Sequence, residues 1–182
     1  MTEPSETHEP RIALWRHARA IGLLPAVVTL VVPALLLKRN PDWNVGWSLP
    51  PPWSALPVVS ACALFALGLL LMSRTIALFH GVGGGTLAPF DSPRRLVVRG
   101  VYRNVRNPMI SGVFAILLGE AVLLGSRVLL VWFLCFVLLN ALYIPLVEEP
   151  DLERRFGDDY RLYKRNVRRW IPRRRPWEGL SK

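Results

Sequence analysis

The sequence predicts an all-α polytopic membrane protein with four transmembrane helices, or five if residues 75–90 also cross the membrane. Of its 182 residues, 52% are hydrophobic, and they gather in runs close to the ~20 residues that cross a bilayer as a helix. The 23 basic and 13 acidic residues lie between and after these runs. A C-terminal helical hairpin and an amphipathic cytosolic helix complete the predicted fold, which we treat as a single membrane domain over residues 1–182.

The first predicted span covers residues 21–37 and follows a polar N-terminal segment, residues 1–20. Pro25 and Pro33 lie inside the span and should kink it, because proline removes a backbone donor and clashes with the preceding turn. No small-residue cleavage site follows the apolar run, so we expect an uncleaved span rather than a signal peptide.

The second predicted span covers residues 55–73 and is preceded by a loop, residues 38–54. This loop contains three Trp residues, which are typical of the interface between membrane and water. Residues 75–82 are also apolar, and they either continue the second helix or lie in the interface.

The third and fourth spans, residues 109–124 and 128–147, are joined by only three residues and must form an antiparallel hairpin. Glu120 lies inside the third span, where a charge is costly. We expect Glu120 to reach water or to pair with Arg127. Small residues that recur at every fourth position of the third span predict close packing against another helix: Ser111, Ala115 and Gly119.

After the fourth span the sequence predicts an amphipathic helix that lies on the membrane surface or covers a polar site. Its apolar face is formed by Leu152, Phe156, Tyr160, Tyr163, Val167 and Trp170. Its other faces carry Arg154, Arg155, Arg161, Lys164, Arg165, Arg168 and Arg169. A basic tail, residues 174–182, follows and should be attracted to anionic lipid.

The distribution of basic residues predicts the orientation in the membrane. Six basic residues lie in the segment 74–108 and eleven after residue 148, against two in the loop 38–54 and one in the turn 125–127. We therefore expect both termini, and the polar segments near residues 100 and 148, on the cytoplasmic side. The net charge of +10 fits this arrangement and anionic lipid better than nucleic acid.

Two polar clusters are the candidate functional sites: the segment 83–112 and the pair Glu148 and Glu149. Arginine and backbone N–H groups bind carboxylate or phosphate, and a carboxylate binds ammonium or sugar hydroxyls. Together they suit a zwitterionic nucleoside ligand. The same residues also fit a simpler interpretation, in which the arginines only set orientation and the acids precede Pro150 at a helix start.

Several function classes lack support in the sequence. Cys62 and Cys135 both lie inside apolar runs and indicate neither a disulfide framework nor a metal site. The chain has no paired-histidine metal motif, no Gly-x-Ser-x-Gly elbow and no Walker motif. Hydrolysis and phosphoryl transfer are therefore not indicated.

Two stretches resemble motifs of a known family of membrane enzymes. They read GTLAPFDSPRRLVVRGVYRNVRNPMISG, ending at Gly112, and EEPDLERRFGDDYRLYKRNVRRWIPR, beginning at Glu148, with a predicted hairpin between them. In this order and at this separation they resemble the isoprenylcysteine carboxyl methyltransferase and phospholipid methyltransferase family. The resemblance covers residues 83–173, which would form the catalytic region.

The resemblance implies an all-helical enzyme that transfers a methyl group from S-adenosyl-L-methionine to a lipid-borne or other apolar small acceptor in the bilayer. It implies a cytosol-facing cofactor site and no nucleic-acid partner, and it indicates no required protein partner. Glu149, beside a cofactor-binding Glu148, is the candidate base for an acceptor that must lose a proton. The cofactor-binding positions that it implies are Arg94, Arg95, Leu96, Val97, Tyr102, Asn107, Pro108, Met109, Ile110 and Glu148.

The chain departs from the family pattern at three positions. Asn107 stands where the family has His, Ile110 where it has Tyr, and Ile144 where the prenylcysteine enzymes have a substrate-positioning Arg. A carboxylate acceptor is therefore not expected. Two alternatives remain open at this point: a membrane protein of the same fold that binds a ligand or acts as a scaffold without turnover, and a membrane reductase that uses a nicotinamide cofactor.

Overall fold

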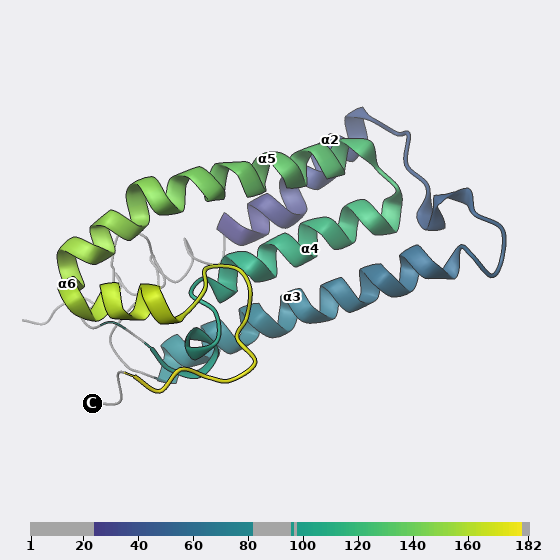
Figure 1. Cartoon of the computed structure of the whole chain (residues 1–182). Coiled ribbons are helices and arrows are strands. Elements are labelled where there is room, and N and C mark those ends of the chain that lie inside the picture. Colours follow the sequence, from purple (N-terminus) through teal and green to yellow (C-terminus); the bar gives the residue numbers. More distant parts are fainter. Residues whose placement is uncertain (1–23, 82–95, 97, 180–182) are drawn as a thin grey trace, which may run out of the picture.

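The computed structural model of the chain describes residues 24–81, 96 and 98–179. All regular structure in these residues is helical, which confirms the predicted class. Four helices run side by side, and α6 folds back at one end of this bundle (Figure 1). The helices are α2 (Val32–Arg39), α3 (Ala55–Gly81), α4 (Pro108–Leu124), α5 (Arg127–Tyr143) and α6 (Glu149–Asn166).

The first helix is irregular where its prolines lie, as the sequence predicted. A π-helical turn, η1 (Val27–Val31), precedes α2, and Pro33 lies in the first turn of α2. Proline cannot donate a backbone hydrogen bond, and a wider turn is one way to accommodate it. The Trp132 Nε1 of α5 donates a hydrogen bond of 3.2 Å to the Val28 carbonyl and ties this helix to the bundle.

Helix α3 is a single helix of 27 residues. Residues 75–81 therefore continue the second predicted span instead of forming an interfacial segment. At ~1.5 Å per residue such a helix is about 40 Å long, which exceeds the ~30 Å hydrocarbon core of a bilayer. Its C-terminal end thus reaches the polar end of the molecule, where the candidate site lies (Figure 1).

Helices α3 and α4 approach each other closely through glycine. A Cβ atom built on Gly68 would lie 2.7 Å from the Gly112 carbonyl oxygen, and one built on Gly112 would lie 2.8 Å from the Gly68 carbonyl oxygen. Ala115 and Gly119 are buried in the same helix, as predicted for the small-residue face of α4. Gly112, rather than the neighbouring Ser111, makes the close contact. The Ser111 hydroxyl instead donates to the Asn107 carbonyl at 2.9 Å.

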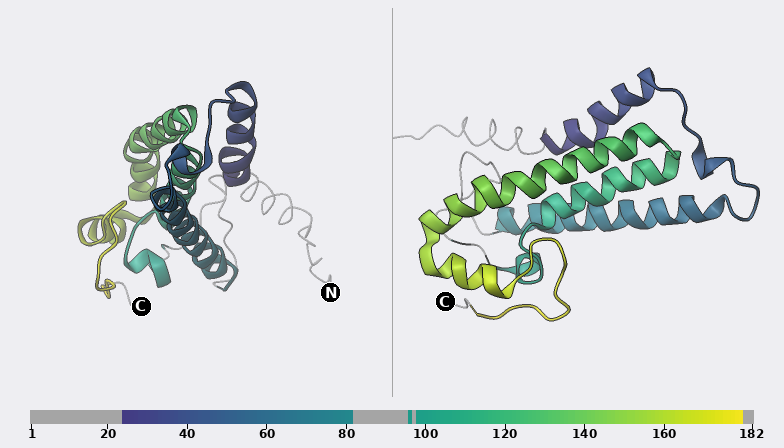
Figure 2. Two further views of the ribbon diagram at one scale, coloured as in Figure 1. Left: turned by 90° about the vertical axis from the view of Figure 1, so that its right-hand side faces the viewer. Right: turned by 45° about the horizontal axis from the view of Figure 1, so that its top comes forward.

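Helices α4 and α5 form the predicted hairpin. Gly125 turns the chain in the left-handed region at φ 56°, and the Ser126 side chain caps α5 by accepting from the Leu129 amide at 3.4 Å. At the same end, the Trp47 Nε1 donates to the Val122 carbonyl at 2.7 Å. The loop before α3, which contains the short 3₁₀ helix η2 (Val45–Ser48), thus packs on the hairpin turn (Figure 2).

Helices α5 and α6 belong to one continuous helix, Arg127–Asn166, with a π-helical turn η4 (Ile144–Glu148) between them. The apolar part ends at Val147, so Glu148 and Glu149 lie just beyond the segment that could span a membrane. Glu149 is the first residue of α6 and Pro150 lies in its first turn, as the simpler interpretation of the pair expects, although the π-helical turn before them continues the helix backwards. The chain then bends sharply at Gly157, which has φ 54° and ψ −128°, a conformation open essentially to glycine alone.

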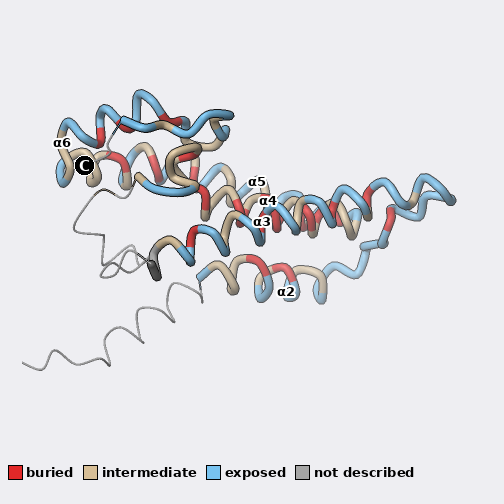
Figure 3. The backbone as a smooth tube through the Cα atoms, turned by 90° about the horizontal axis from the view of Figure 1, so that it is seen from below, coloured by how far each residue is buried: buried red, intermediate tan, exposed pale blue. Residues whose placement is uncertain are grey.

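The helices expose apolar surface over most of their length. Within the described residues, α3 and the helix Arg127–Asn166 are long and apolar enough to cross a bilayer. Figure 3 shows buried residues concentrated along α4, while the other helices turn exposed residues outward. The outward residues of α5 are almost all apolar, which fits a lipid environment rather than water: Leu130, Val131, Leu134, Leu138, Leu139 and Leu142.

Glu120 interrupts this apolar interior near the hairpin turn. No ion pair joins it to Arg127, and its Oε2 is buried with no hydrogen-bond partner among the described residues. The predicted pairing with Arg127 is therefore wrong.

Candidate active site

The polar end of the molecule is built by a segment that lies between α6 and the C-terminal residues. This segment comprises the 3₁₀ helix η3 (Gly100–Arg103) and the residues up to α4. The Arg106 amide donates to the Arg168 carbonyl at 2.9 Å, and the Arg173 amide donates to the Asn104 carbonyl at 2.8 Å. Two parts of the chain that are about sixty residues apart are thus joined by backbone hydrogen bonds.

Aromatic side chains complete this joint. The Tyr163 hydroxyl of α6 donates a hydrogen bond of 2.7 Å to the Tyr102 carbonyl of η3. The Tyr163 ring also stacks at a tilt on Trp177, with centroids 5.8 Å apart. The bend at Gly157 makes this contact possible, because it turns the second half of α6 back toward η3 (Figure 1).

Glu149 lies at the centre of an ion-pair network. Its carboxylate Oε1 accepts from Arg106 Nη1 at 2.8 Å and from Arg169 Nε at 2.8 Å, while Oε2 lies 3.0 Å from Lys164 Nζ. The Glu149 side chain is only 2% exposed and the Arg106 side chain 10%. Burial alone would raise the pKa of Glu149, but the hydrogen bond from Lys164 and the charges of Arg106 and Arg169 together hold it below its usual value.

This network determines what Glu149 can do. A carboxylate with a lowered pKa and three cationic partners is a weak proton acceptor. It holds Arg106, Arg169 and Lys164 together, and so links the segment before α4 to both ends of α6. The geometry therefore argues against the base role predicted for Glu149 and favours a positioning role.

Glu148 has the opposite environment, although it is the adjacent residue. It is half-buried, and within the described part of the chain no hydrogen bond or ion pair to its carboxylate is found. Burial raises its pKa, the charge of Glu149 adds to this effect, and Arg169 and Arg106 oppose it. A carboxylate in this state gains most from a ligand that brings a cation or hydroxyl donors.

Tyr102 belongs to the same cluster. Burial raises the pKa of its hydroxyl, and the nearby Glu148 charge raises it further. Tyr102 therefore keeps its proton throughout the physiological range and can act as a donor. The structure thus brings together Tyr102 and Glu148, two of the predicted cofactor-binding residues.

The predicted contacts at the start of α4 lie near this cluster. Pro108 is buried at the first helical position, and Met109 and Ile110 are half-buried. Asn107 precedes the helix, and its amide N–H donates to the Arg169 carbonyl at 3.3 Å. The Asn107 side chain makes no capping hydrogen bond to α4, which leaves its amide group available.

Leu96 has a different setting from the other predicted contacts. It packs, with Val98, against a small core formed by Tyr160, Tyr163 and Val167. Leu96 therefore helps to attach its segment to α6. The predicted cofactor-binding residues Arg94, Arg95 and Val97 lie outside the described residues.

The partners of Glu149 could not be recognised from the sequence. Arg106 belongs to the polar segment 83–112, and Lys164 and Arg169 lie on the basic faces of the predicted amphipathic helix. The separations of 43 residues from Arg106 to Glu149 and of 20 residues from Glu149 to Arg169 carry no periodic signal. Only a burial prediction for Glu149 could have suggested that cations had to surround it.

Comparison with known proteins gives two matches. Residues 56–159 match the family model described as phospholipid methyltransferase. An uncharacterized protein of Haemophilus influenzae is 36% identical over 63 residues, which cover 35% of this chain and 100% of that protein. No solved structure matches. The region matched by the family model contains Tyr102, Glu148 and Glu149, and it ends inside α6 before Arg169.

Proposed function

The chain belongs to the phospholipid methyltransferase family, and on this premise we propose that it uses S-adenosylmethionine to methylate a lipid-borne or other apolar small acceptor. Family membership implies a membrane methyltransferase, and the long apolar helices fit that setting. The methyl donor, the class of acceptor and the residues that hold them are the parts we propose.

One observation carries the proposal: Glu148 is a half-buried carboxylate with no hydrogen-bond or ion-pair partner among the described residues, and it lies near fixed guanidinium groups. S-adenosylmethionine offers an ammonium group and ribose hydroxyls, either of which satisfies such a carboxylate. It also carries a carboxylate of its own. Arg106 has a buried Nε with no partner among the described residues, so this part of the cluster offers a donor as well as an acceptor.

We assign the residues accordingly. Glu148 binds the ammonium group or the ribose hydroxyls of the cofactor. The protonated Tyr102 hydroxyl, which lies near Glu148, is a hydrogen-bond donor in the same site. Glu149 is a positioning residue, which fixes Arg106 and Arg169 through its ion pairs. The remaining predicted cofactor contacts are kept as part of the proposal: Arg94, Arg95, Leu96, Val97, Asn107, Pro108, Met109 and Ile110.

When bound, the cofactor supplies an electrophilic methyl group on a sulfonium. The task of the protein is to hold the acceptor about 3–3.5 Å from that methyl carbon and to exclude water, which is where most of the rate enhancement would come from. A neutral amine needs no base at the moment of attack, because its lone pair forms the new C–N bond as the sulfur leaves, and the resulting ammonium can release its proton to water afterwards. The lack of a free base at Glu149 is therefore compatible with methyl transfer to an amine.

The acceptor is limited by Ile144. This residue is 1% exposed inside η4, so the chain presents no cation where the prenylcysteine enzymes hold a substrate carboxylate. We therefore propose an amine acceptor rather than a carboxylate, since a hydroxyl would also need a base that Glu149 does not provide. The apolar outer surface of α5 offers a route for such an acceptor to approach from the bilayer.

The test is a methyl-transfer assay with the purified protein, labelled S-adenosylmethionine and a total lipid extract. We expect label in the lipid fraction, and we expect Glu148→Gln to remove it. Asp159→Asn serves as the matched control, because Asp159 is an exposed acid on α6 that forms no ion pair with any described residue. Label confined to water-soluble products, or transfer unchanged in Glu148→Gln, would contradict the proposal.

A further inference from the structure

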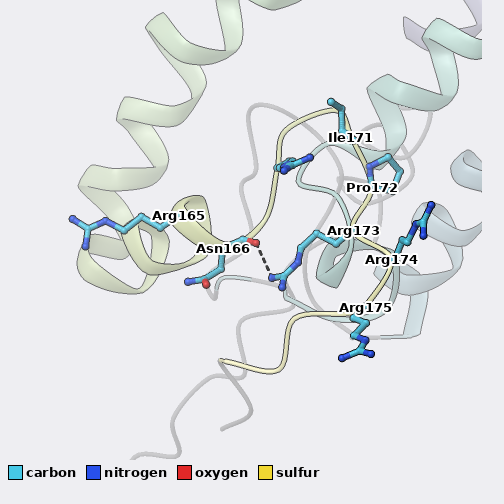
Figure 4. Close-up of a pocket in the computed structure, with 8 residues that line it drawn as sticks. Arg165, Asn166, Ile171, Pro172, Arg173, Arg174 and Arg175 are labelled. Carbon is cyan, nitrogen blue, oxygen red and sulfur yellow. Dashed lines mark hydrogen bonds between the residues drawn. The ribbon is translucent and has the colours of Figure 1, made fainter.

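Five arginines line one open pocket beside the C-terminal end of α6. The pocket has a volume of about 600 Å³, and neither Glu148 nor Glu149 is among its lining residues. Figure 4 shows Arg173 directed toward Asn166, with Arg165 at the left of the view and Arg174 and Arg175 at the right. Its lining consists of Arg165, Asn166, Arg168, Ile171, Pro172, Arg173, Arg174 and Arg175.

Among the residues that the structure describes, no acidic side chain balances the charges of this pocket. Elsewhere on α6, basic residues pair with acids: Arg155 with Asp151 at 3.4 Å, and Arg161 with Asp158 at 3.0 Å. Within the described residues, none of the pocket arginines forms an ion pair, and no acidic residue lines the pocket. Five cations around one opening make the local potential positive, so an anion that enters the pocket is stabilised.

One of the arginines is already held in place. Arg173 Nη1 donates to the Asn166 carbonyl at 2.7 Å. Its backbone is fixed as well, because its amide donates to the Asn104 carbonyl and its carbonyl accepts from Asn104 Nδ2, both at 2.8 Å. A guanidinium that is held before binding loses less conformational entropy when a ligand arrives.

The position of the pocket indicates where its ligand comes from. Trp170, just before the pocket residues, packs on Phe114 in the second turn of α4, with ring centroids 5.1 Å apart. Phe114 in turn contacts Phe136 of α5, at 5.9 Å, so the loop meets the spanning helices themselves. Ile171 and Pro172 line the pocket, and Ile171 is 61% exposed. Arginines beside an exposed apolar tip at the end of membrane helices lie at the level of lipid headgroups.

We propose that this arginine pocket binds the phosphate group of a lipid headgroup in the leaflet next to it. The planar guanidinium matches phosphate oxygens in a two-point hydrogen bond, which a general surface charge does not provide. The pocket is separate from Glu148, and it needs no bound S-adenosylmethionine. It would hold the C-terminal segment at the membrane surface through a specific lipid contact.

The experiment measures binding by calorimetry, in neutral detergent and without S-adenosylmethionine. One arm uses dihexanoyl phosphatidylglycerol below its micelle concentration, and the other uses inorganic phosphate. We expect the lipid to bind and inorganic phosphate to bind at least about tenfold more weakly, because the apolar tip contacts only the lipid. Equal binding of both would show a soluble anion as the ligand and would overturn the lipid assignment.

Two double variants locate the site. Arg174→Gln with Arg175→Gln removes two pocket charges that make no hydrogen bond within the described structure, and we expect at least about tenfold weaker lipid binding. Arg154→Gln with Arg161→Gln removes the same charge from exposed positions outside the pocket, and binding should stay within about twofold of the native protein. An equal loss in both, or no lipid binding by the native protein, would overturn the proposal. Thermal midpoints check that each variant is folded.

Discussion

Glu148 and Glu149 are adjacent, yet the structure gives them opposite environments. Successive residues of a helix point about 100° apart, so two neighbours face different surroundings. Glu149 points to Arg106 and Arg169 in the interior, whereas Glu148 remains half-buried and unpaired within the described residues. The first arrangement stabilises the fold, and the second is suited to a ligand.

The first prediction concerns the stability provided by Glu149. Glu149→Gln should lower the free energy of unfolding by about 3–5 kcal/mol, because it leaves the largely buried Arg106 and Arg169 without their counter-charge. Glu148→Gln should lower it by less than about 1 kcal/mol, since it removes no ion pair. Denaturant unfolding in detergent micelles measures both. Equal losses for the two variants would contradict the separation of roles.

The second prediction is a pH dependence of cofactor binding. The pKa of Glu148 is raised above the ordinary 4.5 by burial and by Glu149, so its carboxylate forms only at higher pH than usual. Affinity for S-adenosylmethionine should therefore rise with pH through this titration and then level off. Calorimetry from mildly acidic to mildly alkaline pH measures the curve, and Glu148→Gln should remove this titration from it.

The pKa of Glu149 is shifted in the opposite direction from that of Glu148. The titration that affects stability can therefore be distinguished from the titration that affects binding. The folded-state pKa of Glu149 is lowered, so its contribution to stability is present above the ordinary 4.5 and is lost as the pH falls through the folded value. An acid-induced loss of stability below that point, absent in Glu149→Gln, is the expected result. A loss that is unchanged in the variant would show that other carboxylates are responsible.

The sequence located this pair but could not rank its members. Both acids precede Pro150 in a polar stretch, and nothing in their order shows which one is buried. The decision depends on Arg106 and Arg169, which reach Glu149 from distant parts of the chain. Tyr102, by contrast, was predicted through its motif, and the structure places it near Glu148.

At the level of the elements, the bend in α6 brings the site together. Gly157 adopts φ 54° and ψ −128°, and a Cβ atom there would meet nothing within 4 Å. Glycine is therefore needed at position 157 for its backbone conformation and not because a side chain would clash with a neighbour. The bend directs Tyr160 and Tyr163 back onto Leu96 and Val98.

The third prediction follows from this bend. Gly157→Ala should destabilise the folded-back half of α6 by about 1–3 kcal/mol, because alanine is strained in this conformation. S-adenosylmethionine binding should weaken with it, and proteolysis should reach the C-terminal segment sooner. Asp158→Ala, the next residue along, changes an exposed pair and serves as control. Unchanged proteolysis in Gly157→Ala would show that the bend is not required.

The fourth prediction concerns the α3–α4 contact. Gly68→Ala places a methyl group 2.7 Å from the Gly112 carbonyl oxygen, so the two helices must separate. We expect a loss of about 1–3 kcal/mol, as for other overpacked sites. Ala66→Leu adds more volume on the exposed side of the same helix and should be nearly neutral. Thermal unfolding of the two variants in detergent compares them directly.

The elements were predictable where one pattern dominates and not where two compete. The hairpin of α4 and α5 follows from apolar runs separated by Gly125, Ser126 and Arg127, and it is present as predicted. The sequence predicts one helical face from Leu152 to Trp170, whereas α6 bends at Gly157 and ends at Asn166. Its apolar residues keep helical spacing on both sides of Gly157, and this continuity concealed the bend.

Viewed as a whole, the molecule has two unlike ends joined by apolar helices. The loop before α3 and the hairpin turn lie at one end, and η3, α6 and the C-terminal segment lie at the other (Figure 1). The number of spans and the cytoplasmic orientation of the arginine-rich end remain predictions from hydropathy and charge.

The fifth prediction tests that orientation. In a background of Cys62→Ser and Cys135→Ser, Asp42→Cys places a thiol in the loop before α3 and Asp159→Cys places one on α6. A membrane-impermeant maleimide should label Asp42→Cys in intact cells and Asp159→Cys only after lysis. The reverse pattern would place the candidate site on the outer side of the membrane.

We propose that Glu148 binds the methyl donor, whereas Glu149 stabilises the fold. Calorimetry of S-adenosylmethionine binding to the native protein, Glu148→Gln and Glu149→Gln tests it most directly, with NADPH as the comparison ligand. We predict binding by the native protein, a loss of at least about tenfold in a folded Glu148→Gln, and no binding of NADPH. Unchanged affinity in Glu148→Gln, or binding of NADPH in place of S-adenosylmethionine, would contradict the account.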